Sequence, residues 1–219
     1  MRILLFITGH SQLEEYNYFS KLLNSLSISN ICDVVIYCNN SNISSKIVSY
    51  YQQFNQTNKQ LIITNKNSGY RIGGVEAVSN GFDLNLFNDY DYVIHLHPDV
   101  FIVDDNKLLT VLNENLNNDY VFLITQSLPY DNKYFSFDFF IFKPKLLTTN
   151  IFKEELYIFK TLPEYYLHDM IIKNNIKYKF IERYNNNNWE PRRVAENLSI
   201  YHEHNLSNVY NLLHSKNLI

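Results

Sequence analysis

The chain has 219 residues, of which 46% are hydrophobic and 16% aromatic, a composition that excludes an intrinsically disordered protein. Its formal net charge of -3 predicts no nucleic-acid partner, because such proteins need a basic face that neutralises phosphates. No apolar segment reaches the length of a membrane span, and neither a repeat nor a long linker is visible, so we expect no transmembrane segment and one domain over 1–219.

The first part of the chain alternates between strand and helix patterns. A continuous apolar run at 3–8 predicts a strand that is buried on both faces, and apolar residues then recur at helical spacing over 13–26. Two further strands are expected at 33–37 and 60–64, with a helix at 43–54 between them. This alternation is typical of a parallel sheet with crossover helices, so the predicted fold class is α/β.

The remaining elements continue this pattern. We expect helices at 75–86, 107–116 and 161–174, and strands at 91–98, 120–125, 135–142 and 177–183, with a strand-like tail at 198–204. The helix near residue 161 is marked by Thr161 as N-cap, an early Pro163, and Glu164 closing a capping box.

The two cysteines suggest where the protein is located. On the strand expected at 33–37, Cys32 and Cys38 would lie about 20 Å apart, which is too far for a disulfide. Two reduced thiols in the core favour a cytoplasmic protein.

The stretch from Asn67 to Asp99 carries the strongest functional signal. It joins the loop Asn67-Ser68-Gly69-Tyr70-Arg71-Ile72-Gly73-Gly74 to a helix, and then to a strand that ends in an acidic residue. Here the sequence resembles the nucleotide-sugar glycosyltransferases of the GT-A type. In that family the helix lies under the donor nucleotide, and the strand delivers an Asp-x-Asp motif to the metal and diphosphate. The resemblance covers most of the chain and implies a GT-A-like single domain with a mostly parallel central sheet and flanking helices.

The resemblance also implies a metal site. His97-Pro98-Asp99 stands where the family has Asp-x-Asp, so Asp99 is the expected ligand and His97 a further candidate. The family often adds a C-terminal histidine, which here is His202, slightly favoured, or His204. The expected ion is Mn²⁺ or Mg²⁺, and Mn²⁺ accepts imidazole as well as oxygen. His95 lies deeper in the strand and is expected to be a hydrogen-bonded core histidine.

Each of these assignments has a structural alternative. Asp99 would then only cap the short segment after Pro98, and His202 and His204 would be surface histidines of the C-terminal tail.

The donor site follows from the same resemblance. The family binds the base and ribose at the turn after the first strand, here Thr8-Gly9-His10. Further candidates for donor contacts are Gly73 of the glycine loop and His97. Arg71 and Arg192 are candidates for the phosphates, because arginine makes bidentate contacts with phosphate. Neighbouring Arg193 is an alternative to Arg192, and ordinary surface salt bridges are the alternative role for these arginines. A UDP-sugar is the favoured donor.

A catalytic base would take the proton of the acceptor hydroxyl in an inverting transfer. The family often places a carboxylate at the start of a late helix, and Leu167-His168-Asp169 is the nearest match, which makes Asp169 the first candidate. Asp138 is its rival, because an acid within an apolar strand is costly unless it has a partner or a role. The structural alternatives are a solvated helix surface for Asp169 and a local cap for Asp138.

The expected function is metal-dependent transfer of a sugar from a nucleotide-diphosphate sugar to the hydroxyl of a glycan or other acceptor. One alternative is a module that binds the nucleotide sugar without turnover, suggested by the loss of the first acid of the motif. The other is a zinc hydrolase, because His95-Leu96-His97-Pro98-Asp99 matches a His-x-His-x-Asp metal-binding pattern.

Overall fold

A computed structural model describes residues 1–9, 13–40, 42, 44–65, 72–126, 135–147, 149–152, 162–181, 193–195 and 198–219. Its strands are β1 (Ile3–Gly9), β2 (Cys32–Cys38), β3 (Lys59–Ile63), β4 (Tyr92–Leu96), β5 (Val100–Ile102), β6 (Phe122–Gln126), β7 (Phe135–Phe142), β8 (Tyr178–Ile181), β9 (Arg193–Ala195) and β10 (Ile200–His202). Its helices are α1 (Leu13–Asn24), α2 (Ser44–Tyr51), α3 (Gly73–Asp83), α4 (Asn106–Glu114), α5 (Pro163–Lys173) and α6 (Leu206–Ser215), with short 3₁₀ helices at Ser27–Asn30 and Pro144–Leu146.

Most strands form one sheet in the order β3-β2-β1-β4-β7-β6-β8. β1 pairs in parallel with β2 and β4, and β6 pairs in parallel with β8. β7 runs antiparallel to both of its neighbours, β4 and β6. The predicted α/β class with a mostly parallel sheet is therefore confirmed.

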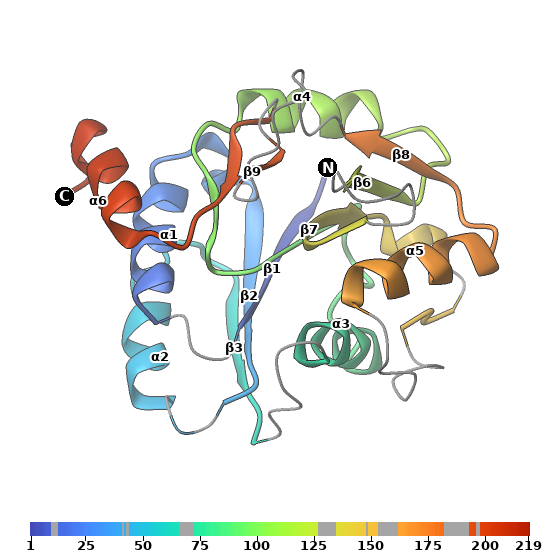
Figure 1. Cartoon of the computed structure of the whole chain (residues 1–219), viewed down its shortest axis with the longest axis horizontal. Helices are drawn as coiled ribbons and strands as arrows, with labels where there is room; N and C mark the ends of the chain where they lie inside the picture. The colour runs from blue at the N-terminus through green and yellow to red at the C-terminus, as the bar shows by residue number, and fades with distance from the viewer. Residues whose placement is uncertain are drawn as a thin grey trace.

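Helices cover both faces of this sheet, as Figure 1 shows for α1, α2 and α6 on one side and α3 and α5 on the other. Successive side chains of β1 point to opposite faces of the sheet, and so they contribute to the core on each face. Ile3, Leu5 and Ile7 pack into the core under the first helix group, whereas Leu4 and Phe6 pack into the core under the second. The sheet is thus buried on both faces, as the continuous apolar runs predict.

A small sheet lies beside the large one and differs from the expectation. β5, β10 and β9 form a three-stranded antiparallel sheet in the order β5-β10-β9. Only the strand-like tail at 198–204 is expected from sequence, and its strand is limited to Ile200–His202. β5, β9 and the C-terminal helix α6 are missing from the sequence prediction. β5 and β9 have three residues each, which are too few to show the alternation of apolar and polar side chains that marks a strand.

Other boundaries differ by smaller amounts. α5 begins at Pro163 with Leu162 at its N-cap position, where a Thr161 cap was expected, and Thr161 itself lies outside the described residues. Cys32 and Cys38 are buried free thiols at the two ends of β2. No helix within the described ranges is long and apolar enough to span a membrane.

The position of α3 depends on close packing at Gly81. A Cβ added there would overlap the ring of Phe87, which is fully buried and packs edge-on against Phe6 at a centroid distance of 5.0 Å. In Gly81→Ala, we expect the clash to outweigh the gain of about 1 kcal/mol in helix propensity, because overpacking costs about 1–3 kcal/mol. Urea unfolding should therefore show a lower free energy of unfolding.

A second variant tests the cause of this loss. Phe87→Leu removes the ring carbons that the new methyl group meets, so Gly81→Ala combined with Phe87→Leu should be less destabilised than the sum of the two single variants. Strict additivity would contradict the clash.

Candidate metal centre

The pairing of β5 with β10 brings together residues that are about a hundred positions apart in sequence. β4 ends at Leu96, and the chain then passes through Asp99 into β5. His202 pairs with Val100, and the backbone N–H of Glu203 donates to the carbonyl of Asp99 at 3.0 Å. Because alternate residues of an extended chain face the same side, His202 and His204 both reach Asp99.

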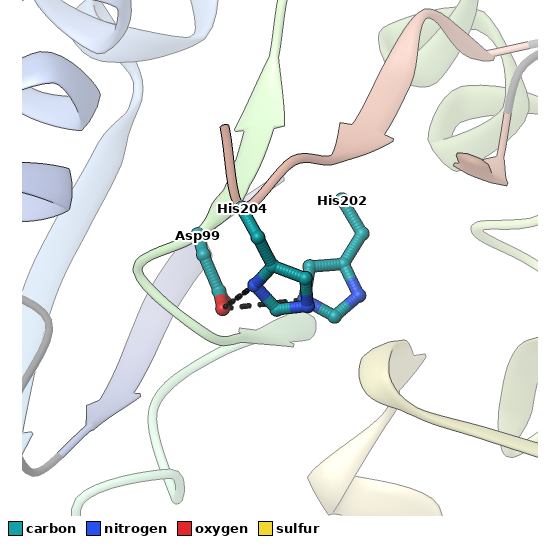
Figure 2. Close-up of side chains that lie close together, drawn as sticks. All are labelled: Asp99, His202 and His204. Carbon is teal, nitrogen blue, oxygen red and sulfur yellow. Dashed lines mark ion pairs between the residues drawn. The ribbon is translucent and has the colours of Figure 1, made fainter. Parts of the chain in front are cut away.

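The side chains of Asp99, His202 and His204 form a compact group (Figure 2). Oδ2 of Asp99 lies 3.2 Å from Nε2 of His202 and 3.3 Å from Nδ1 of His204. One ligand atom from each residue lies within 4.8 Å of the others, which is the spacing of donors around one metal ion. Asp99 is 4% exposed, whereas the side chain of His204 is 58% exposed, so the group opens toward solvent on the His204 side.

Two buried atoms of this group have no hydrogen-bond partner among the described residues. They are Oδ1 of Asp99 and Nε2 of His202. Nε2 lies near the carboxylate, but it is not aligned for a hydrogen bond with it. Buried polar atoms without partners are rare, and a cation between them would satisfy both. One carboxylate and two imidazoles are also a donor set that suits a borderline divalent metal. The residues therefore fit a metal ion.

The electrostatics of the group favour the ionised carboxylate. Burial alone would raise the pKa of Asp99, but His202 and His204 hold it well below its usual range. Burial alone would lower the pKa of His202, whereas the carboxylates of Asp138 and Asp99 raise it to about 10. In the metal-free chain the carboxylates thus hold Asp99 ionised and His202 protonated, and a metal ion bound here would displace a proton from His202.

His97 lies next to this group but outside it. Its backbone N–H donates to the carbonyl of Asp138 at 3.1 Å, and its Nδ1 lies 3.2 Å from Oδ1 of Asp138. Oδ2 of the same carboxylate lies 3.3 Å from Nδ1 of His202. The structure thus places His97 on Asp138 and does not bring it to Asp99 with the other candidate ligands. Its proposed roles in metal and donor binding stay predictions.

His95 is a core residue, as expected. Its ring is fully buried, and its Nε2 lies 3.0 Å from the hydroxyl of Thr8. Thr8 is itself 3% exposed, so its side chain supports His95 from inside the sheet. The predicted donor contact of Thr8 remains a prediction.

Two of the predicted donor residues meet at the carboxyl edge of the sheet, through Asn39. The backbone N–H of Asn39 donates to the carbonyl of Gly9 at 3.2 Å, and a Cβ at Gly73 would overlap the side-chain amide of Asn39. Asn39 is not among the residues predicted from the sequence, although its place directly after the buried strand β2 marks this edge. His10, Arg71 and Arg192 lie outside the described residues, and for Arg193 only the backbone is described.

Asp169 lies on α5. Among the described residues, no contact joins it to Asp99, His202 or His204. Its side chain is 68% exposed, and Oδ1 lies 2.9 Å from Nδ1 of His168. The ring of His168 packs against Phe135, the first residue of β7, at a centroid distance of 4.9 Å. Its role as a base stays a prediction.

Comparison with known proteins shows the fold and not the family. No protein-family model and no curated protein sequence matches the chain. Solved structures do match, at low sequence identity. A putative nucleotide-diphospho-sugar transferase from Desulfovibrio desulfuricans is 11% identical with a TM-score of 0.55, and the match covers 98% of this chain and 96% of that one.

Two further matches are glycosyltransferases. The galactosyltransferase LgtC, solved with donor and acceptor sugar analogues, is 12% identical with a TM-score of 0.54, covering 81% of this chain and 73% of that one. The mannosyltransferase PcManGT from Pyrobaculum calidifontis, solved with GDP-Man and Mn²⁺, is 10% identical with a TM-score of 0.51. That match covers 66% of this chain but only 45% of the mannosyltransferase. The chain therefore shares its fold with nucleotide-sugar glycosyltransferases of the GT-A type.

Proposed function

We propose that this protein is a glycosyltransferase that uses a divalent metal ion to transfer a sugar from a nucleotide-diphosphate sugar to an acceptor hydroxyl. The convergence of Asp99, His202 and His204 carries the proposal. In an open α/β sheet, ligands bind at the carboxyl ends of the strands where the strand order reverses. Asp99 follows the carboxyl end of β4. The strand order reverses between β1 and β4, because β2 and β3 lie on one side of β1 and β4 lies on the other.

The ion would be held by Asp99, His202 and His204. Once bound, it supplies positive charge to the diphosphate that leaves as the sugar bond breaks. Two imidazoles in the ligand set favour Mn²⁺ over Mg²⁺, because Mg²⁺ prefers oxygen ligands in a strict octahedron. The structural neighbour solved with GDP-Man and Mn²⁺ supports the same ion and the same class of donor.

The remaining roles rest on the family resemblance. The donor, with a UDP-sugar favoured, would bind beside Gly9 and Gly73, whose backbones meet Asn39 at the sheet edge. Asp169 is the proposed base for a glycan or other hydroxyl acceptor.

The zinc-hydrolase alternative finds no support in the structure. It requires His95, His97 and Asp99 to share one ion, but His95 contacts Thr8 and His97 contacts Asp138.

Donor binding is expected to depend on the metal. At a donor concentration about 100 times Kd, a ligand that binds only the folded state adds about 2.7 kcal/mol, which corresponds to roughly 5–10 °C in Tm for a chain of this size. We expect such a shift from a UDP-sugar with Mn²⁺ and a much smaller one with EDTA. A panel of nucleotide sugars, each with Mn²⁺, Mg²⁺ or EDTA, measures this by thermal shift.

The same panel separates the transferase from a binding module. A transferase also releases sugar slowly to water when it holds the donor and Mn²⁺, whereas a module without turnover gives the thermal shift alone. If no nucleotide sugar raises Tm in the presence of Mn²⁺, the proposed function is wrong.

A further inference from the structure

One carboxylate connects the two sheets beside the candidate metal centre. Asp138 lies on β7 of the large sheet, and His202 lies on β10 of the small sheet. Leu96 pairs with Phe139 in the antiparallel β4–β7 ladder, so the next position of each strand sets His97 opposite Asp138. Side chains of residues opposite each other stand on the same face, which brings the ring of His97 to the carboxylate.

Both oxygens of Asp138 lie against imidazole nitrogens. Oδ1 is 3.2 Å from Nδ1 of His97, and Oδ2 is 3.3 Å from Nδ1 of His202. Hydrogen bonds and ion pairs of this kind occupy the positions from which a general base would take a proton. The contacts therefore favour a role for Asp138 that is different from that of the base.

The orientation of His202 is the feature that Asp138 controls. Nδ1 of this ring lies near Asp138, while Nε2 lies near Asp99 and has no hydrogen-bond partner among the described residues. When a metal ion displaces one proton from the ring, the neutral imidazole carries its hydrogen on one nitrogen and keeps a lone pair on the other. A carboxylate at Nδ1 holds the hydrogen there and leaves the lone pair of Nε2 for a metal ion.

We propose that Asp138 is a positioning residue that sets the tautomer and ring orientation of His202, so that Nε2 of His202 binds the metal held by Asp99 and His204. The inference rests on the metal site of the proposed function. It assigns Asp138 a role in metal affinity through His202, with His97 fixing the other oxygen of the carboxylate. His204 differs from His202, because its own Nδ1 lies 3.3 Å from Asp99 and its side chain is 58% exposed.

Metal affinity without donor or acceptor tests this role directly. Mn²⁺ is titrated into the full chain, and free Mn²⁺ is measured by electron paramagnetic resonance. We expect Asp138→Ala to bind Mn²⁺ about 10- to 100-fold more weakly, the usual cost of losing a carboxylate behind a metal-bound histidine. In a His202→Ala background, Asp138→Ala should cause no further loss, because a residue that acts through His202 has nothing left to orient.

Asp119→Ala is the matched control. Asp119 also pairs with a cationic side chain, that of Lys177. It precedes β6, which runs in the same direction as β4 because both are antiparallel to β7, so it lies at the opposite edge of the sheet from Asp99. It should keep the wild-type affinity. Equal Mn²⁺ affinity in Asp138→Ala and the wild type would overturn the positioning role alone, as would an undiminished loss in the His202→Ala background. A wild-type chain that does not bind Mn²⁺ would overturn the metal site as well.

A second measurement does not depend on the alanine variant folding. Nitrogen-15 NMR of the imidazoles in the Zn²⁺-loaded chain reports which ring nitrogen carries hydrogen, with His202→Gln identifying the signals. The wild type should show hydrogen on Nδ1 and metal on Nε2 of His202, and the isosteric Asp138→Asn should show a smaller metal-bound fraction of this ring at the same limiting Zn²⁺ concentration. Metal bound through Nδ1 of His202, or an equal metal-bound fraction in Asp138→Asn, would overturn the proposal.

Discussion

Replacing Asp99 with asparagine is expected to lower Mn²⁺-dependent sugar transfer by about 10²-fold or more, the scale on which a single preorganised electrostatic element acts. The substitution keeps the size of a side chain that is only 4% exposed, so the fold should survive. It removes the sole negative charge of the Asp99, His202 and His204 group. Because charge grows on the leaving diphosphate, a cation there stabilises the transition state more than the ground state. Initial rates at saturating donor and Mn²⁺ measure the effect.

Asp91→Asn provides the control for this experiment. Asp91 precedes the same strand, β4, and contacts Lys145 at 2.8 Å, at the end of the strand remote from Asp99. It should leave turnover unchanged. Normal turnover by Asp99→Asn would show that the proposed site is not the place of the reaction.

The sequence predicted the large sheet because its strands carry long apolar runs. β1 and β2 each have seven residues and are buried almost throughout, so their composition alone marks them as central strands. β5 and β9 have three residues each, and their formation depends on β10 lying between them. Such pairing is a tertiary event without a local period, and so it could not be predicted from the sequence.

The family resemblance predicts that Asp99 shares a metal site with a C-terminal histidine, His202 or His204. The structure brings both histidines to Asp99, and their meeting depends on the short β5–β10 ladder, which no local sequence pattern marks. His97 was selected by the same resemblance, yet its position opposite Asp138 is set by the antiparallel pairing of β7 with β4. The sequence shows no strand direction, so the contact between Asp138 and His202 could not be anticipated.

Donor binding and proton removal are separate steps, so variants of different residues can test them separately. Donor binding needs the metal centre, whereas proton removal needs a carboxylate on the acceptor side. Asp169 is well suited to meet a substrate from solvent, because its side chain is 68% exposed. Oδ1 of this carboxylate lies 2.9 Å from Nδ1 of His168, whose ring packs on Phe135 at the start of β7.

Asp169→Asn is therefore expected to keep the Mn²⁺-dependent thermal shift with the donor, while transfer to the acceptor falls by about 10²- to 10⁴-fold, the usual contribution of a general base. The amide has nearly the size of the carboxylate but cannot take the hydroxyl proton. Asp89→Asn, which changes a carboxylate that is 78% exposed and lies near Arg2, is the matched control and should transfer normally. Loss of the thermal shift in Asp169→Asn would instead place Asp169 in donor binding. Normal transfer by this variant would remove Asp169 as the base, and a reaction that retains the anomeric configuration, which needs no such base, would then account for the transfer.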